Sequence, residues 1–449
     1  MSIWVDPWLN FPVNLVQITP GAGAMYCGNC FRDNALVAAL RQMGHDVTMV
    51  PLYLPLTLDE EDQSAETPIF FGGINVYLEQ KSGLFRKAPH WLRRMFASRK
   101  LLGWAAGRAA STRATDVGDI LLSMLRGEEG RQARELDELI SWLKRQGTPD
   151  AICLSNALLV GMARRLKAEL QAPVVCTLQG EDSFVDGLPD SHRAAAWELL
   201  SERAADVDLF IAPSRYFAEF MGGRLRLPAD RVRVVYNGIN LDGYQTATPA
   251  VEGGFRGAPV LGFLARMCKE KGLDTLVDAF ILLKQSGRVG NLRLRIGGSC
   301  GPSDEPFVKR LRQRLAAAGF IGQVGFNPNL AHSEKLEFLR SLMIFSVPAN
   351  YGEAFGLYVI EALAAGVPVV QPRTGAFPEL IEATGGGVLC EPGDPKSLAD
   401  AIEQLLINSK QVQTLGEAGR KAVFEKFNAE AMATETLRVF DELNSSRKS

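Results

Sequence analysis

The stretch EAFGLYVIEALAAGVPVV, residues 353–370, combines a loop, a helix and a strand in one short segment. The apolar residues between Leu357 and Leu363 follow helical spacing, and the apolar run that begins at Val367 predicts a strand. A loop therefore enters a helix near Gly356, and a strand follows it. The unpaired N–H groups at such a helix start favour an anion such as phosphate.

The same alternation of short apolar runs and helix-like stretches extends through the rest of the chain. The apolar runs are rich in Val, Ile and Leu and lack strict alternation, as buried parallel strands do. They predict strands at 13–18, 46–52, 150–154, 173–177, 208–212, 231–235, 260–264, 292–296, 344–347 and 367–370. Helices are predicted between them, for example at 34–43, 273–283 and 397–406, the last beginning at Ser397. We therefore predict an α/β fold with two Rossmann-like, doubly wound domains.

A linker separates the two blocks. Residues 244–259 are rich in Gly, Pro, Ala and Thr and have no apolar periodicity. We expect an N-terminal domain at 1–245, with an insertion at about 55–147, and a C-terminal domain at 255–425. Residues 426–449 are expected to form a helix that crosses back to the N-terminal domain.

The composition is that of a globular protein, with 449 residues, 47% hydrophobic, 22% charged and a net charge of −2. This charge argues against a nucleic-acid binder that works by bulk positive charge. No run of about 18 apolar residues predicts a membrane span, and the N-terminus lacks the pattern of a signal peptide. The seven scattered cysteines predict reduced thiols in a cytoplasmic protein.

Two pairs of charged residues stand beside predicted helix starts. Glu353 precedes the helix and can accept hydrogen bonds from a polyol, while Glu361 lies about one turn inside it and suits a ribose diol. Spacing alone fits two surface glutamates equally well. Arg266 and Lys271 lie between a predicted strand and helix, where two cations suit a diphosphate. An isolated Arg and Lys are more often part of a solvated basic loop.

Taken together, these segments resemble retaining glycosyltransferases of family four, which have the GT-B fold. Residues 353–370 resemble the family's Glu-x7-Glu signature, and 265–274, ARMCKEKGLD, resemble its Arg-x4-Lys diphosphate loop. Further similar segments follow in the same chain order: NALVAALRQMGHDVTMV at 34–50, IAPSRYF at 211–217 and YNGIN at 236–240. The resemblance implies two domains that face each other across a cleft, with acceptor binding in residues 1–245 and nucleotide-sugar binding in residues 255–425. It also implies a retaining hexosyltransferase of carbohydrate biosynthesis.

The resemblance also implies roles for individual residues. Arg266 and Lys271 would hold the donor diphosphate, and Glu353 would contact the donor sugar; these three are the catalytic candidates. The donor-binding candidates are Gly28, Phe326, Asn327, Phe355, Gly356, Leu357 and Glu361. The family requires no metal, and no D-x-D motif follows a strand here. The expected donor is a UDP-sugar, with a GDP- or ADP-sugar as the alternative, and the expected acceptor is a carbohydrate or lipid-linked molecule.

The chain departs from the family at the histidines of the N-terminal domain. Ser155, Asn156 and Gln179 stand where relatives carry histidine. Gln179 can hydrogen-bond a sugar hydroxyl, but it cannot titrate as a base. Glu181 and Asp182 follow it, either as acceptor contacts or as caps of the next helix. The acceptor-side candidates are Asn29, Gln179, Glu181 and Asp182.

No clear protein base or nucleophile emerges from the sequence. The resemblance implies front-side attack with retention, in which an oxygen of the leaving group takes the acceptor proton. Two alternatives stay open: a GT-B nucleotide-sugar epimerase, and a catalytically silent sugar-nucleotide sensor, which the missing histidines keep in play. A phosphorylase would need a pyridoxal-bearing lysine, whose sequence context is not seen.

Residues 83–108 contain seven Lys and Arg and no acidic residue. They predict an amphipathic helix, either packed on the first domain or in peripheral contact with an anionic membrane surface. The sequence leaves the oligomeric state open.

The stretch AMYCGNC, residues 24–30, carries Cys27 and Cys30 in C-x-x-C spacing. A zinc site needs about four ligands, and no second pair exists to complete one. The resemblance offers another interpretation, because Gly28 has the spacing to Gly44 of the second glycine in the family's glycine turn. Gly28 would then let the backbone approach the donor phosphates.

Overall fold

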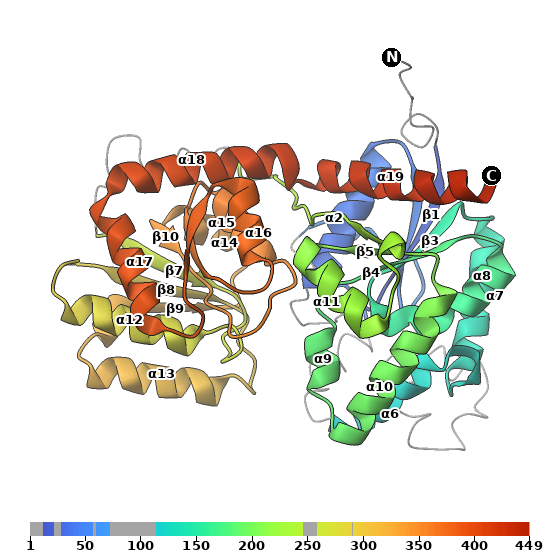
Figure 1. The fold of residues 1–449 in the computed structure, drawn as a ribbon, viewed down its shortest axis with the longest axis horizontal. Coiled ribbons are helices and arrows are strands. Elements are labelled where there is room, and N and C mark those ends of the chain that lie inside the picture. The colour runs from blue at the N-terminus through green and yellow to red at the C-terminus, as the bar shows by residue number, and fades with distance from the viewer. Residues whose placement is uncertain are drawn as a thin grey trace, which may run out of the picture. The chain divides into compact units, whose positions relative to one another are not determined.

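The computed structural model describes residues 12–21, 28–56, 60–71, 114–245, 258–289 and 291–448. The chain forms two compact units (Figure 1). The first unit consists of Met1–Tyr236 together with Met432–Ser449, and the second of Asn237–Ala431. The C-terminal residues from Met432 onward therefore belong to the first unit.

The first unit is built on a six-stranded parallel sheet with the strand order β2-β1-β3-β4-β5-β6. The central strands β3, β4 and β5 are buried along their whole length, which explains their continuous apolar composition. The strands are β1 (Asn14–Thr19), β2 (Asp46–Pro51), β3 (Ala151–Leu154), β4 (Val174–Thr177), β5 (Leu209–Ala212) and β6 (Val232–Val234).

Helices flank both faces of this sheet (Figure 1). They are α2 (Gly28–Gln42), α6 (Ala114–Leu125), α7 (Ala133–Gln146), α8 (Ala163–Leu170), α9 (Asp182–Asp186), α10 (Asp190–Arg203), α11 (Arg215–Leu225) and α19 (Ala429–Lys448). Short 3-10 turns occur at η3 (Gly127–Glu129), η4 (Ala157–Met162), η5 (Ala204–Asp206) and η6 (Ala229–Arg231). Helices α6 and α7 lie inside the predicted insertion, between β2 and β3 in the chain. Helix α6 packs on α10, and α7 packs on α8. The basic segment 83–108 lies outside the described residues.

The second unit contains another six-stranded parallel sheet, with the order β12-β11-β10-β7-β8-β9. Its strands are β7 (Val260–Leu264), β8 (Arg293–Gly298), β9 (Val324–Pro328), β10 (Ile344–Phe345), β11 (Val369–Pro372) and β12 (Gly387–Cys390). Its helices are α12 (Leu273–Gln285), α13 (Glu305–Ala317), α14 (His332–Arg340), α15 (Leu357–Ala364), α16 (Phe377–Thr384), α17 (Pro395–Ile407) and α18 (Ser409–Lys426), with one 3-10 turn, η7 (Ile321–Gln323).

All ten predicted strands are present, and the α/β prediction with two doubly wound sheets is confirmed. The two strands missing from the prediction, β9 and β12, are the edges of the second sheet, where residues are only partly buried. One helix start was wrong. Helix α17 begins at Pro395, not Ser397, because the Asp394 side chain accepts hydrogen bonds from the N–H groups of Lys396 and Ser397.

Each sheet has a point at which the strand order reverses. In the first sheet the chain leaves β1 toward β2 on one side and continues with β3 on the other. In the second sheet it leaves β7 toward β8 and continues with β10 on the other side. Ligands of open α/β sheets bind outside the carboxyl ends of the strands at such a reversal. The fold therefore directs attention to the loops after β1 and β3 and to those after β7 and β10.

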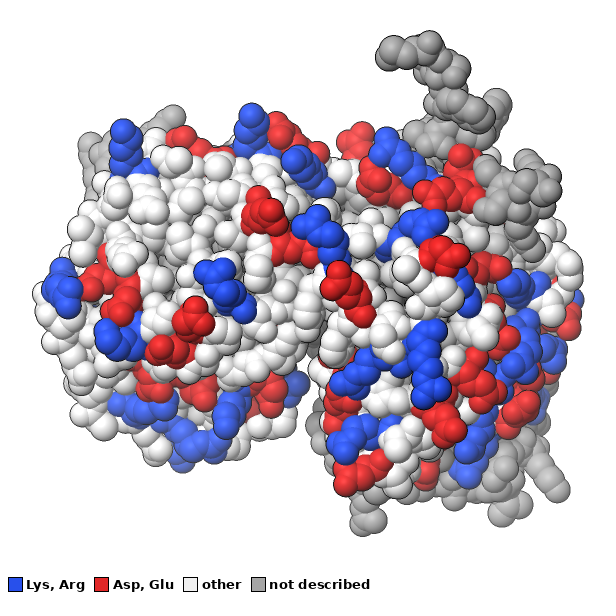
Figure 2. Space-filling model, in the orientation of Figure 1, with Lys and Arg blue, Asp and Glu red and all other residues white. Residues whose placement is uncertain are grey.

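The surface carries both signs of charge. On the face shown in Figure 2, basic and acidic side chains are interspersed over each unit. Ion pairs such as Lys144–Glu169, at 2.7 Å, and Arg165–Asp137, at 2.8 Å, join neighbouring helices of the first unit. Among the described residues, no helix is both long and apolar enough to cross a membrane.

Candidate active site

The predicted catalytic residues lie in loops at the strand-order reversal of the second sheet, where Lys271 and Glu353 are in contact. Arg266 and Lys271 lie in the loop between β7 and α12, and Glu353 lies in the loop between β10 and α15. Strands β7 and β10 are neighbours in the sheet, so their following loops emerge side by side. The fold thus brings together residues that are more than eighty positions apart in the chain.

Lys271 and Glu353 form the centre of the site. The Lys271 Nζ lies 2.5 Å from the Glu353 Oε2 and 2.5 Å from the Tyr351 hydroxyl. Hydroxyls of Tyr351 and Tyr358 donate to the same Oε2 at 3.0 and 2.7 Å. The ammonium also lies 5.1 Å from the centroids of both tyrosine rings, within cation–π range.

The electrostatics of this cluster keep Glu353 ionised. Burial acts to raise the pKa of Glu353, but the charge of Lys271 and hydrogen bonds from Lys271, Tyr358 and Tyr351 outweigh it and lower the pKa below its ordinary value. All three hydrogen bonds end on Oε2. The other oxygen, Oε1, has no hydrogen-bond partner among the described residues, and it can accept a bond from a ligand hydroxyl.

Glycines and backbone bonds hold the two loops together. Gly272 has φ +70°, and a Cβ there would lie 1.7 Å from the Pro348 carbonyl oxygen. Across the same boundary, the Asn350 N–H donates to the Glu270 carbonyl and the Asn350 side chain to the Lys269 carbonyl, both at 2.9 Å. These contacts require a residue without a side chain directly after Lys271.

A second glycine, Gly375, packs closely against the backbone of Glu353. Gly375 has φ +60°, and a Cβ on it would lie 2.5 Å from the Glu353 backbone nitrogen. The next residue, Ala376, donates its N–H to the Glu353 carbonyl at 2.9 Å. The backbone of Glu353 is therefore fixed from two sides.

The predicted loop-to-helix transition lies at Gly356, which caps α15 with φ +93°. Leu357 is the first helical residue, and it is half-buried. The Phe355 side chain is buried and packs on Phe427, with ring centroids 6.2 Å apart. A contact of the 355–357 backbone with a donor stays a prediction.

Glu361, the predicted ribose ligand, has an opposite charge beside it. The Lys335 Nζ, from α14, lies 2.9 Å from the Glu361 Oε1, and both side chains are largely buried, at 8% and 15% exposed. The ribose role of Glu361 stays a prediction.

Arg266 is also paired. Its guanidinium forms a forked ion pair with Asp304, with Nε–Oδ1 at 3.1 Å and Nη2–Oδ1 at 2.9 Å. Hydrogen bonding to Asp304 raises the pKa of Arg266. The Arg266 side chain remains 56% exposed.

The predicted base-side residues lie on the edge strand β9. Phe326 is half-buried under the guanidinium of Arg312, whose Cζ lies 4.0 Å from the ring centroid. Asn327 is half-buried, and its Oδ1 has no hydrogen-bond partner. Their roles as donor contacts stay predictions.

In the first unit, the predicted glycine turn opens helix α2. Gly28 is the first helical residue, and both Gly28 and Asn29 are partly exposed. The described cysteines are free thiols, and Cys30 is buried. Cys27 lies outside the described residues. No group of three or more His, Cys, Asp or Glu side chains suited to a metal occurs in the part of the chain that the structure describes.

A buried charge pair follows one turn into α2. Arg32 and Asp33 lie 3.0 Å apart with side chains that are 0% exposed. The Ser155 hydroxyl, after β3, donates to the Asp33 Oδ2 at 2.5 Å. Burial raises the pKa of Asp33 despite these partners. Ser155, predicted to stand where relatives carry histidine, is thus part of a buried network with Arg32 and Asp33.

The acceptor-side candidates after β4 differ in exposure. Gln179 and Asp182 are partly exposed, and burial raises the pKa of Asp182. Glu181 is buried, with Oε1 accepting from the Ala157 N–H at 2.9 Å and Oε2 from the Gln179 N–H at 2.6 Å. Burial raises the pKa of Glu181. Both carboxylate oxygens therefore accept hydrogen bonds from backbone N–H groups. Contact of Glu181 with the acceptor substrate stays a prediction.

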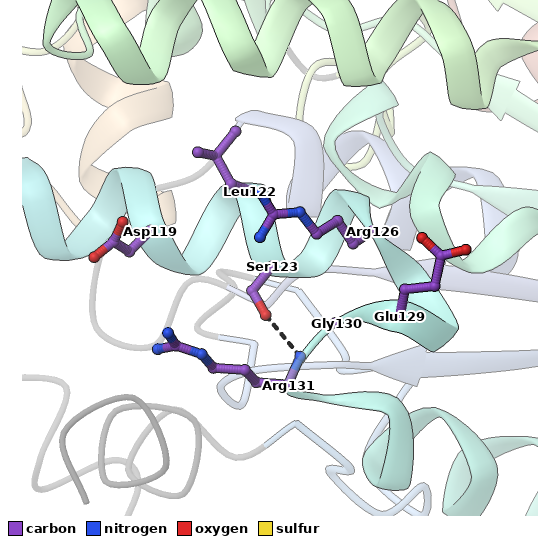
Figure 3. A pocket seen from close by; sticks show the side chains of 7 residues that line it. All are labelled: Asp119, Leu122, Ser123, Arg126, Glu129, Gly130 and Arg131. Atoms are coloured by element: carbon purple, nitrogen blue, oxygen red, sulfur yellow. Dashed lines mark hydrogen bonds between the residues drawn. The ribbon is translucent and has the colours of Figure 1, made fainter.

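A cavity of about 220 Å³ lies elsewhere in the first unit (Figure 3). It is formed by α6, η3 and the turn that precedes α7, and the Ser123 hydroxyl accepts from the Arg131 N–H at 2.8 Å on its wall. Its lining residues are Asp119, Leu122, Ser123, Arg126, Glu129, Gly130 and Arg131. None of them is a predicted site residue, and their opposing charges do not single out an anion.

Sequence reasoning missed several residues that build the site. Tyr358 lies inside the signature stretch and Tyr351 just before Glu353, but aromatic residues at such positions read as core. Asp304 and Lys335 carry no local signal, because each meets its partner only through the fold. The glycines 272 and 375 would have been recognisable only from their required backbone angles.

Comparisons with known proteins identify the family of this chain. Residues 246–422 match the family model of group 1 glycosyl transferases, and residues 107–242 match that of glycosyltransferase family 4. The chain is 30% identical over 320 residues to a D-inositol 3-phosphate glycosyltransferase of Corynebacterium jeikeium, covering 68% of this chain and 75% of that protein. It is 30% identical over 216 residues to a phosphatidyl-myo-inositol mannosyltransferase of Mycobacterium leprae, covering 48% and 54%.

Solved structures share the fold at low sequence identity. The Anabaena protein HepE, in complex with UDP and glucose, has a TM-score of 0.64 at 15% identity and covers 96% of this chain and 100% of that one. A sucrose-phosphate synthase from Thermosynechococcus elongatus has a TM-score of 0.66 at 19% identity, with 97% and 100% covered. The chain belongs to glycosyltransferase family 4, and it is a glycosyltransferase with the GT-B fold.

Proposed function

We propose that this enzyme transfers a hexose from a nucleoside diphosphate sugar to an acceptor hydroxyl, with retention of configuration and without a metal. The observation that carries the proposal is the Lys271–Glu353 pair at the strand-order reversal of the second sheet, with Arg266 in the same loop as Lys271. This constellation offers cations to a diphosphate and a carboxylate oxygen to a sugar.

The cations act on the leaving group. As the bond between the anomeric carbon and the diphosphate breaks, negative charge grows on the diphosphate oxygens. Lys271 and Arg266, held in place before the reaction, stabilise that charge. Glu353 stays ionised, and its Oε1 accepts a hydrogen bond from a hydroxyl of the donor sugar.

The proton of the acceptor hydroxyl goes to an oxygen of the departing diphosphate. This route needs no protein base, which is consistent with Ser155 and Asn156 in place of histidines. Asn156 instead caps η4, since its Oδ1 accepts from the Leu158 N–H at 3.0 Å. Attack and departure on the same face of the sugar give a product with the anomeric configuration of the donor.

We favour a UDP-sugar as the donor, with GDP- and ADP-sugars as alternatives. A protein of the same fold was solved in complex with UDP and glucose, which supports UDP as the first choice of donor nucleotide. Two relatives are named for inositol-based molecules, one for D-inositol 3-phosphate and one for phosphatidyl-myo-inositol. We therefore propose a carbohydrate or lipid-linked acceptor with a free hydroxyl.

A two-step experiment tests the proposal. UDP-, GDP- and ADP-sugars are first screened for thermal stabilisation of the protein, because only a bound donor raises the melting temperature. Donors that bind are then incubated with inositol-based and carbohydrate acceptors, and nucleoside diphosphate release is measured. Transfer that is unchanged in both Lys271→Ala and Glu353→Ala would contradict the proposal, and binding without any turnover would favour a sensor.

Two further measurements address stereochemistry and metal. The anomeric configuration of the transferred sugar in the product glycoside, read by NMR coupling constants, should equal that of the donor. A chelator should leave the rate unchanged, because Arg266 and Lys271 neutralise the diphosphate. Inversion, or a rate that falls with chelator and returns with a divalent cation, would contradict these parts of the proposal.

Membrane contact through 83–108 and a cytoplasmic location stay predictions. Co-sedimentation with anionic vesicles tests the contact. Binding that disappears in neutral vesicles and at high salt would support it, and absence of binding to anionic vesicles would remove it.

A further inference from the structure

The ion pair between Arg266 and Asp304 fixes the orientation of the guanidinium as well as neutralising its charge. Arg266 donates from Nε to both carboxylate oxygens of Asp304, at 3.1 and 3.2 Å, and from Nη2 to Oδ1 at 2.9 Å. Its third nitrogen, Nη1, has no hydrogen-bond partner in the described parts of the chain. One edge of the guanidinium is thus occupied, while the side chain as a whole is 56% exposed.

Asp304 is a fixed anchor. Its side chain is only 8% exposed, and its Oδ2 also accepts from the Gly301 N–H at 3.1 Å. Its backbone N–H donates to the Gly301 carbonyl at 2.9 Å, and its carbonyl accepts from the Val308 N–H in the first turn of α13. The carboxylate therefore cannot follow Arg266 if that side chain moves.

The backbone of Arg266 is held just as firmly. Its neighbours Ala265 and Met267 donate to the carbonyls of Gly297 and Ser299 at 3.3 and 2.9 Å. Gly298, between these two acceptors, has φ +115°, and a Cβ there would lie 1.9 Å from the Ala265 carbonyl oxygen. The end of β8 and the residue that follows it thus hold the loop after β7 on both sides of Arg266.

A long, half-exposed arginine normally samples many rotamers, and ordering it costs binding free energy. The bonds from Nε and Nη2 to the Asp304 carboxylate remove most of the rotamer freedom of Arg266. They also fix the direction in which the remaining N–H donors of the guanidinium point. We propose that Asp304 is a positioning residue that orients Arg266 for the donor diphosphate before the donor binds. The inference rests on the proposed function, since it takes the diphosphate as the ligand of Arg266.

The opposite role is also chemically conceivable. Asp304 and a diphosphate are both anions, so Asp304 would weaken donor binding if it competed for the same edge of Arg266. The two roles predict opposite signs. Neutralising Asp304 weakens diphosphate binding if it positions Arg266, and strengthens it if it competes.

The test is a double-mutant cycle on the full-length chain, read by calorimetric titration with UDP. Asp304→Asn keeps the shape and an acceptor for the Gly301 N–H, and we expect it to raise the Kd about 3- to 10-fold. On an Arg266→Ala background the same substitution should leave the Kd unchanged. Should Asp304→Asn fail to fold, Asp304→Ser keeps an acceptor for Gly301 and replaces it.

A matched control is Asp278→Asn, which neutralises another Arg–Asp pair of the second unit, to Arg314 at 2.9 Å. It should leave the Kd unchanged. A Kd for Asp304→Asn that is unchanged or lower, or an effect that persists without Arg266, would overturn the inference while leaving the proposed function intact. If the wild type binds none of UDP, GDP and ADP, the proposed function itself fails, and the inference with it.

Discussion

Glu353 in the second unit and Glu181 in the first are both shielded carboxylates beside predicted site residues, yet they are bonded in opposite ways. Glu353 receives its hydrogen bonds from side chains, all on one oxygen, and keeps the other oxygen available. Glu181 receives backbone N–H groups on both oxygens. The first arrangement can take a ligand, and the second ties two loop segments together.

The electrostatics follow the same division. A lysine lowers the pKa of Glu353, whereas burial without a cation raises the pKa of Glu181. In the second unit, Arg266, Lys271 and Glu361 each have an opposite charge within 3 Å. We propose that the second unit carries charges arranged for chemistry, while the Glu181 carboxylate of the first unit ties loop segments together.

The largest effect should come from removing the central cation. Lys271→Ala should lower kcat about 100- to 1,000-fold, because it removes a group that stabilises the charge of the leaving diphosphate and leaves Glu353 without its cation. Steady-state kinetics with saturating acceptor provide the measurement. Lys396→Ala, which removes an exposed Lys–Asp pair of the same unit, is the control and should leave kcat unchanged. An equal loss of kcat in Lys271→Ala and Lys396→Ala would contradict a catalytic role for Lys271.

Glu181→Ala should act on stability instead. It removes the carboxylate that accepts from the N–H groups of Ala157 and Gln179, at a cost of about 2 kcal/mol. We expect a lower melting temperature and a donor KM close to that of the wild type. Loss of turnover at an unchanged melting temperature would show that Glu181 acts on substrate, and the comparison would then break.

The pH dependence of stability should differ in sign between the two glutamates. The folded pKa of Glu353 lies below its ordinary value of 4.5, so its contribution is present above pH 4.5 and is lost as pH falls through the folded pKa. The folded pKa of Glu181 lies above 4.5, so ionisation costs stability as pH rises from 4.5. Relative to the wild type, the stability deficit of Glu353→Gln should grow with rising pH, and that of Glu181→Gln should shrink. Denaturant unfolding from acid to neutral pH measures both, and slopes of the same sign would contradict this account.

The smallest effect is expected at the ribose end. Lys335→Gln removes the partner of Glu361 and should raise the donor KM about 5-fold, equivalent to about 1 kcal/mol, with kcat nearly unchanged. Lys335→Arg keeps the charge and should restore most of the lost donor affinity.

A donor without the ribose 2′-hydroxyl tests Glu361 itself. Its KM should exceed that of the normal donor in the wild type, and the difference should be much smaller in Glu361→Gln. An equal difference in both proteins would remove Glu361 from the ribose.

The fold was largely predictable because buried parallel strands have a continuous apolar composition. That rule found the central strands and missed β9 and β12, whose edge positions need no such composition. The family resemblance singled out Lys271 and Glu353, and the strand order of the structure explains why their loops are neighbours. The partners of Arg266 and Glu361 were not predicted, since Asp304 meets Arg266 across 38 positions and Lys335 meets Glu361 across 26. The role of Glu181 was hidden because backbone groups, which every residue has, are its partners.

The most direct test of the central claim is the affinity gained from the second phosphate. Calorimetric titration compares UDP with UMP, or the corresponding pair for the base that binds best, on the wild type and on Lys271→Ala. We predict that the diphosphate binds at least ~10-fold more tightly than the monophosphate to the wild type, and that this advantage largely disappears without Lys271. An advantage of the same size in both proteins would contradict the placement of the donor diphosphate at Lys271.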